Sequence, residues 1–144
     1  MRKLLFSIVL TLCYLTIFAQ TDSVKVIDTA NMAKIYVVRA TGHVGSAINL
    51  RVLVNDVMYC KVRNNRYAII YVQPGTHDFF ATSWDGPRAK EKLALKVPVE
   101  AGKTYYLSMK MKQRFLENQI FMEEITYNTA APLLEKLKQD DKCD

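Results

Sequence analysis

The stretch KLALKVPVE, residues 92–100, decides the fold because apolar and other residues alternate along it without interruption. Leucine or valine occupies positions 93, 95, 97 and 99, so a β-strand would place all four side chains on one face. Pro98 lies on the opposite face and has no backbone N–H to donate to a neighbouring strand. The stretch therefore predicts a half-buried strand at the edge of a sheet.

The same pattern extends in both directions from this strand. After the turn at 101–103, the segment TYYLSMKM places Tyr105, Leu107, Met109 and Met111 inward and Tyr106 outward. Upstream, apolar runs separated by turn residues predict strands at 33–40, 47–54, 57–62, 66–73 and 76–84. In the run 47–54, one face carries Ile48, Leu50, Val52 and Val54.

Three short segments predict turns between these strands. Asn55-Asp56 and Asn64-Asn65 are residues that tolerate positive φ, and each pair predicts a hairpin. Pro74-Gly75 predicts a type II turn. The strand 66–73 is apolar on both faces, which favours a central position in a sheet.

The C-terminal part is less regular. Residues 118–127 fit a last strand or an amphipathic helix, and we favour the strand. Residues 129–139 predict a short helix capped by Thr129, with Pro132 in its first turn. Together these elements predict an all-β fold: an antiparallel immunoglobulin-like or prealbumin-like β-sandwich of seven to eight strands with a short C-terminal helix.

The first residues predict export. A cationic start at Arg2 and Lys3, an uncharged apolar stretch and a small residue before a polar run are typical of a secretory signal peptide. We expect a signal peptide at 1–19, an N-terminal leader at 20–32 and a β-sandwich domain with its helix at 33–144. The protein is then periplasmic, at the cell surface or secreted, with no membrane span after cleavage. An uncleaved anchor or lipidation at Cys13 are the alternatives, and Leu12 disfavours lipidation.

The charge balance argues against a nucleic-acid partner. The 144-residue chain has a formal charge of +6, which becomes +4 when Arg2 and Lys3 leave with the signal peptide. The remaining basic residues are scattered among acidic ones rather than gathered on one segment. This predicts a solvated, modestly basic surface with some attraction to anionic components of the envelope.

Two cysteines remain after cleavage, Cys60 in a predicted strand and Cys143 on a polar tail. In an oxidising compartment they can form a disulfide with each other. A buried free Cys60 with a loose Cys143, or a bridge from Cys143 to another chain, are the alternatives.

Three stretches carry a family resemblance: AKIYVVRA at 33–40, YVQPGTHDF at 71–79 and VEAGKTYYLSM at 99–109. Together they resemble the bacterial family called domain of unknown function 2846, over residues 33–127. Its most specific motifs here are the turns at Pro74, Gly75 and His77, and at Ala101, Gly102, Lys103, Tyr105 and Tyr106. The resemblance implies an exported, β-rich protein. The family has no established activity, so the resemblance transfers no catalytic residue.

No recognisable catalytic or cofactor site emerges from the residues. His43 and His77 lack the spacing of a zinc site, and no phosphate-binding or dinucleotide motif occurs. A Cys60–His77 thiol pair is conceivable, but Cys60 fits the core better. The carboxylate pairs 123–124 and 140–141 fit solvated surface charge. We expect no metal, no cofactor and no enzymatic activity.

The residues favour a non-enzymatic binding module whose partner is an envelope protein or polymer. The candidate interaction surface comprises His43, Trp84, Arg88 and Tyr106, with the loops 41–46 and 85–92 beside them. A carrier with an apolar cavity between the sheets is the alternative. A thiol-dependent or histidine-dependent enzyme is the third hypothesis.

Overall fold

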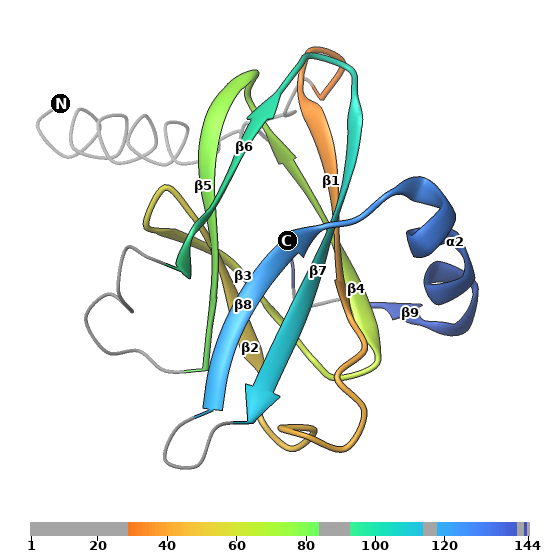
Figure 1. The fold of residues 1–144 in the computed structure, drawn as a ribbon. Helices are drawn as coiled ribbons and strands as arrows, with labels where there is room; N and C mark the ends of the chain where they lie inside the picture. Colours follow the sequence, from red (N-terminus) through yellow and green to blue (C-terminus); the bar gives the residue numbers. More distant parts are fainter. Residues whose placement is uncertain (1–28, 84–92, 114–117, 141–142, 144) are drawn as a thin grey trace, which may run out of the picture.

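The computed structural model of the chain describes residues 29–83, 93–113, 118–140 and 143 (Figure 1). The predicted signal peptide, most of the leader, Trp84 and Arg88 lie outside the described residues. The described part forms two packed β-sheets with one short helix beside them, which confirms the predicted β-sandwich.

Within the described residues, five strands form one sheet and four form the other. The five-stranded sheet has the order β8-β7-β1-β4-β9, and the four-stranded sheet has the order β3-β2-β5-β6. The strands are β1 (Ala33–Arg39), β2 (Leu50–Val54), β3 (Val57–Val62), β4 (Arg66–Val72), β5 (Gly75–Thr82), β6 (Leu95–Val99), β7 (Thr104–Gln113), β8 (Asn118–Glu124) and β9 (Lys138–Gln139).

The five-stranded sheet is mixed rather than purely antiparallel. β7 runs parallel to β1, and β9 runs parallel to β4, while the four-stranded sheet is antiparallel throughout. The chain reaches β7 from β6 in the other sheet, so it enters the five-stranded sheet at the end where β1 begins. Two backbone hydrogen bonds, from Lys34 N–H to Lys103 O (2.9 Å) and from Gly102 N–H to Met32 O (3.2 Å), hold the beginnings of β1 and β7 together. Parallel pairing is possible because the connection crosses between sheets.

The two asparagine turns differ. Asn55 and Asp56 both have positive φ (50° and 66°), and they join β2 to β3 as the predicted hairpin. The hairpin predicted at 64–65 is wrong, because β3 and β4 belong to different sheets. Asn64 instead binds the loop between β1 and β2. Its Oδ1 accepts a hydrogen bond from Thr41 Oγ1 (2.9 Å), and its Nδ2 donates to Gly42 O (2.7 Å).

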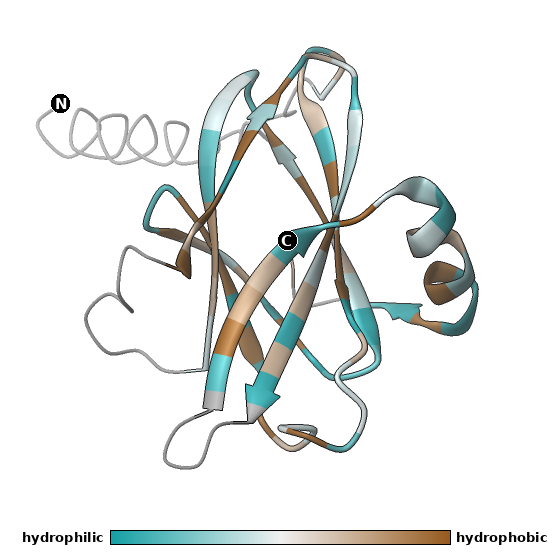
Figure 2. Ribbon diagram, viewed as in Figure 1, coloured by the Kyte–Doolittle hydropathy of each residue, from teal (hydrophilic) through white to brown (hydrophobic). Residues whose placement is uncertain are grey.

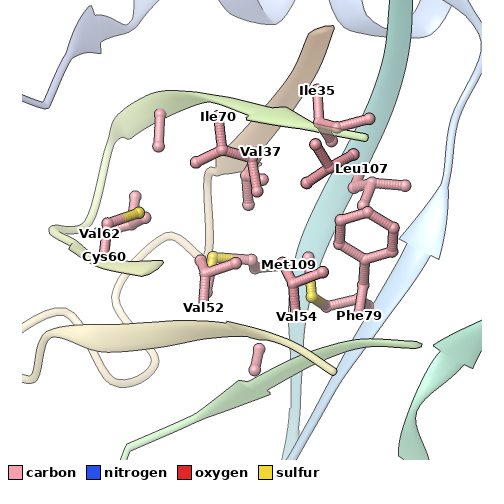
Figure 3. Close-up of a cluster of buried hydrophobic side chains, with 14 of the residues drawn as sticks. Ile35, Val37, Val52, Val54, Cys60, Val62, Ile70, Phe79, Leu107 and Met109 are labelled. Atoms are coloured by element: carbon pink, nitrogen blue, oxygen red, sulfur yellow. The ribbon is translucent and has the colours of Figure 1, made fainter. Parts of the chain in front are cut away.

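The hydrophobic core fills the space between the sheets (Figure 3). Figure 2 shows apolar and polar residues alternating along the strands, and the apolar ones face this core. The alternation predicted for 93–99 is confirmed in β6, an edge strand in which Val97 and Val99 are buried. The inward position predicted for Ile48 is wrong: it precedes β2 and is 41% exposed.

The C-terminal elements begin with β8, where the strand is confirmed over the helix. The helix α2 (Tyr127–Lys136) begins two residues before the predicted start, after Thr126. The Thr126 carbonyl accepts the backbone N–H groups of Thr129 and Ala130, so Pro132 lies inside the helix rather than in its first turn. Ala130 is buried against the five-stranded sheet.

The residues after the helix bridge the two sheets. We call Lys138, Gln139, Asp140 and Cys143 the C-terminal clasp. Lys138 and Gln139, predicted as helix, form β9 beside β4 in the five-stranded sheet. Cys143 forms a disulfide with Cys60 of β3 in the four-stranded sheet. The clasp therefore joins the edges of both sheets on one side of the sandwich.

Asp140 is the polar centre of the clasp. Its backbone N–H donates to Tyr67 O (2.8 Å), and its carboxylate accepts the backbone N–H of Arg63 (2.7 Å) and the Arg63 guanidinium (2.9 Å). The solvated position predicted for Asp140 is wrong, since the residue is 1% exposed. Burial of the carboxylate is tolerated because these donors surround it.

Candidate functional site: a tyrosine face on the five-stranded sheet

The outer face of the five-stranded sheet carries a cluster of tyrosines. Ala33, Ile35 and Val37 of β1 are buried in the core, so Lys34 and Tyr36 point outward. The strand register then places other side chains beside these two. Lys34 is level with Tyr71 of β4 and Thr104 of β7, and Tyr36 is level with Ile69 of β4 and Tyr106 of β7.

The rings form a continuous array along this face. The Lys34 ammonium lies 4.8 Å from the centroid of the Tyr36 ring, and Tyr36 stacks on Tyr106 at 5.3 Å. Tyr106 contacts Tyr127 at 5.7 Å, and Tyr36 contacts Tyr67 at 6.0 Å. These contacts hold the aromatic side chains in fixed relative positions. We call Lys34, Tyr36, Tyr67, Tyr71, Tyr106 and Tyr127 the tyrosine face.

Helix α2 covers one end of the same surface and leaves the other open. The helix contacts β1 and β7, and on these strands Val38 and Ser108 point outward yet are buried. Tyr71 of β4 is 38% exposed, and Tyr127, the first residue of the helix, is 62% exposed. The tyrosine face is therefore an accessible surface with one end supported by a helix.

The surroundings of the face raise the pKa of both its ammonium group and its central phenol. The hydrogen bond to Tyr36 raises the pKa of Lys34, burial opposes this effect, and coulombic interactions with Tyr36, Tyr71 and Tyr106 add to the increase. Burial raises the pKa of Tyr106 above its ordinary value of 10.0. At neutral pH the face thus presents an ammonium group beside phenolic hydroxyls that can donate or accept hydrogen bonds.

Of the four predicted interaction residues, the structure describes His43 and Tyr106 and places them in different elements. Tyr106 lies in the tyrosine face, while Trp84 and Arg88 fall outside the described residues. His43 is exposed in the loop between β1 and β2, where its carbonyl accepts the N–H of Ser46 (3.3 Å). Tyr36, Tyr127 and Lys34 were missed. Lys34 and Tyr36 lie beside β7 because β1 pairs with it, and the sequence pattern alone does not reveal this pairing.

The second histidine makes local hydrogen bonds. His77 Nδ1 lies 2.9 Å from Asn55 Nδ2, and its Nε2 lies 2.7 Å from Gln73 O. Since the Asn55 amide group can only donate from Nδ2, Nδ1 accepts and Nε2 donates. The Cys60 sulfur is bonded to Cys143, and the His77 ring nitrogens face other groups. The structure therefore does not assemble the Cys60–His77 pair.

Arg39 is a buried charge that the sequence reasoning also missed. Its side chain is fully buried and donates to Val62 O (2.6 Å) and Gly45 O (2.8 Å), while no described residue accepts a hydrogen bond from Nε. Burial lowers its pKa, and the charge of Asp140 opposes this effect. Its position two residues after Val37 is the available signal, because period-two alternation directs it inward. Arg39 fixes the β1–β2 loop to the end of β3.

The described residues bring no three histidine, cysteine or acidic side chains into a metal-binding cluster. Within the same residues, no helix has both the length and the apolar character needed to cross a membrane.

Comparison with known proteins gives one assignment. The family described as protein of unknown function (DUF2846) matches residues 29–123, about two-thirds of the chain, which includes β1 to β7 and most of β8. No curated protein and no solved structure shows significant similarity to the chain. The match contains Lys34, Tyr36, Tyr67, Tyr71 and Tyr106, whereas Tyr127 and the clasp follow it. The chain belongs to the DUF2846 family of proteins of unknown function.

Proposed function

We propose that this protein is an exported, non-enzymatic binding module of the cell envelope that recognises its partner through the tyrosine face. The observation that carries this proposal is the continuous array from Lys34 through Tyr36 and Tyr106 to Tyr127 on the outside of the five-stranded sheet. The outer face of a sandwich normally presents polar residues to water. Several tyrosines in mutual contact at such a position are typical of a recognition surface.

The ring contacts favour binding for an energetic reason. A tyrosine supplies a large apolar area and a polar hydroxyl with few rotatable bonds, so little entropy is lost when it is immobilised. Here Tyr36 is already in contact with both Lys34 and Tyr106. A surface whose side chains are ordered before binding avoids part of the cost of association.

The core supports surface recognition over carriage of an apolar ligand. Buried side chains from both sheets occupy the space between them, among them Ile35, Val52, Phe79 and Leu107 (Figure 3). A carrier needs a cavity of several hundred Å³ in this region. The filled core is therefore better suited to support a rigid outer surface.

Site-specific photo-crosslinking in living cells tests the proposal directly. A photoreactive amino acid replaces Tyr71 or Tyr127 on the tyrosine face, and in matched controls it replaces Val57 or Tyr59. The control residues are also exposed but belong to β3, at the edge of the other sheet. We expect discrete adducts with an envelope component from positions 71 and 127 alone. Equal adducts from β3, or none from the tyrosine face, would contradict the proposal.

The export step has its own test. Fractionation of the same cells followed by N-terminal sequencing is expected to find the protein outside the cytosol, beginning near residue 20. An intact N-terminus in the cytosolic fraction would remove the envelope from the proposal.

A further inference from the structure

We infer that the partner of the tyrosine face is an acidic polysaccharide, laid across β4, β1 and β7 with a carboxylate on Lys34. This inference rests on the function proposed above and specifies its ligand. It begins with the row formed by Tyr71, Lys34 and Thr104, which are level with one another on three neighbouring strands. The row offers a phenol, an ammonium and a hydroxyl in succession, and Tyr71 and Thr104 are both exposed.

The spacing of this row suits a chain of sugars. Neighbouring strands lie about 4.8 Å apart, so side chains that are level across them repeat at that distance. This interval is close to the length of one pyranose unit in an extended polysaccharide. A polymer crossing the strands at right angles thus meets one polar group per sugar. The rings of Tyr36 and Tyr106 form the adjacent row and offer further contact area to the same polymer.

The charge of Lys34 selects an acidic polymer over a neutral one. The residues that shift its pKa are Tyr36, Tyr71 and Tyr106, and no ion pair joins Lys34 to a carboxylate among the described residues. An ammonium beside neutral phenols favours an anionic ligand, since a charged donor forms the stronger hydrogen bonds. The formal charge of +4 expected for the processed chain attracts the same class of polymer.

Calorimetric titration of the processed protein with oligogalacturonate tests this inference. The matched neutral ligand is the same oligomer with its carboxylates methyl-esterified. We expect binding to the acidic form that weakens at high salt, and little binding to the ester. Lys34→Gln should weaken binding about tenfold, the loss expected for one charge-assisted hydrogen bond. Tyr71→Ser should also weaken it.

Lys96→Gln is the control for net charge. Lys96 lies on β6 of the other sheet and is well exposed, with Asp78 at 3.8 Å. Lys96→Gln changes the total charge of the protein by the same amount as Lys34→Gln. We expect binding within twofold of the wild type. Circular dichroism spectra of all variants should match, which would exclude misfolding as the cause of any loss.

Three outcomes overturn the inference. These are equal binding of the esterified oligomer, equal weakening by Lys34→Gln and Lys96→Gln, and binding only to vesicles of anionic lipid. If no oligomer binds but Tyr71 and Tyr127 still crosslink to an envelope protein, the polysaccharide is excluded and the proposed function stands. If the crosslinks are absent as well, both fail.

Discussion

The Asp140 carboxylate holds Arg63 by both its backbone and its side chain, with the Arg63 N–H at 2.7 Å and the guanidinium at 2.9 Å. The pair links the residue that follows β9 to the residue that follows β3. Asp140 is shielded from solvent, while the Arg63 side chain is one-third exposed. A short polar tail thereby becomes part of the folded domain.

Removing the Asp140 charge should destabilise the protein. Asp140→Asn leaves an acceptor oxygen for one donor but replaces the other with an NH2 group facing Arg63, and it removes the negative charge that interacts with Arg63 and Arg39. We expect a loss of about 2–3 kcal/mol in the free energy of unfolding, measured by urea denaturation. Asp78→Asn breaks the exposed pair with Lys96 and should change stability by less than about 1 kcal/mol. Equal effects of the two variants would contradict the role assigned to Asp140.

The disulfide of the clasp should contribute a further, separable stabilisation. Cys143→Ser opens a loop that spans 83 residues of sequence, and it should cost about 2–4 kcal/mol of stability. Hydrogen exchange should increase at the Asp140 amide, which donates to Tyr67 O. The wild type in excess dithiol should behave as the variant does. Unchanged exchange in both would show that the clasp holds without the covalent bond.

Two glycines with the same backbone conformation should respond differently to alanine. Gly42 and Gly45 have φ of 65° and 67°, but a Cβ at Gly42 meets no atom within 4 Å. A Cβ at Gly45 falls 2.5 Å from Met111 Cε, and Met111 packs against the core. Gly42→Ala should cost about 1 kcal/mol from the positive φ, and Gly45→Ala should cost more.

Met111 provides the control for this comparison. In a Met111→Ala background the contact disappears, so the two glycine substitutions should cost nearly the same, as thermal unfolding would show. A difference that persists would place the cost of Gly45→Ala on another contact, such as its carbonyl bond to Arg39.

The Tyr106 phenol should make the fold sensitive to alkaline pH. Because its folded pKa is raised above the unfolded value of about 10, the folded state favours the neutral phenol. The resulting stabilisation is complete below pH 10 and is lost as the pH rises through the folded pKa. The raised pKa of Lys34 acts in the same direction. Denaturation between pH 9 and pH 11.5 should show a smaller loss of stability for Tyr106→Phe than for the wild type.

The strands were predictable because their residues repeat locally. The apolar content of β3 and the alternation in β6 predicted these strands correctly. Pro98 correctly indicated that β6 is an edge strand. The pairing of strands was less accessible. Asn64 and Asn65 have the composition of a hairpin turn, but β3 and β4 belong to different sheets, and Asn64 bonds to Thr41 and Gly42, which are distant in sequence.

The candidate site was predictable only in part for the same reason. Tyr106 was identified because the alternation in β7 directs it outward. The stacking of Tyr36 on Tyr106 depends on a parallel register between β1 and β7, which lie about 70 residues apart in the chain. Asp140 was misread because its hydrophilic neighbours suggest a solvated tail, whereas its position is set by Arg63. In both cases, the position of the side chain depends on a residue that is distant in the sequence.

The bond between Cys60 and Cys143 also has a mechanical consequence. When tension is applied to the backbone at residue 143, a covalent path transmits it directly to β3. Residues 61–142 are then bypassed and cannot be stretched while the bond is intact. A pulling experiment between residues 29 and 143 should therefore extend only the segment before Cys60, which includes β1. The strands β4, β7, β8 and β9 lie within the loop that the disulfide closes, and they would carry no tension.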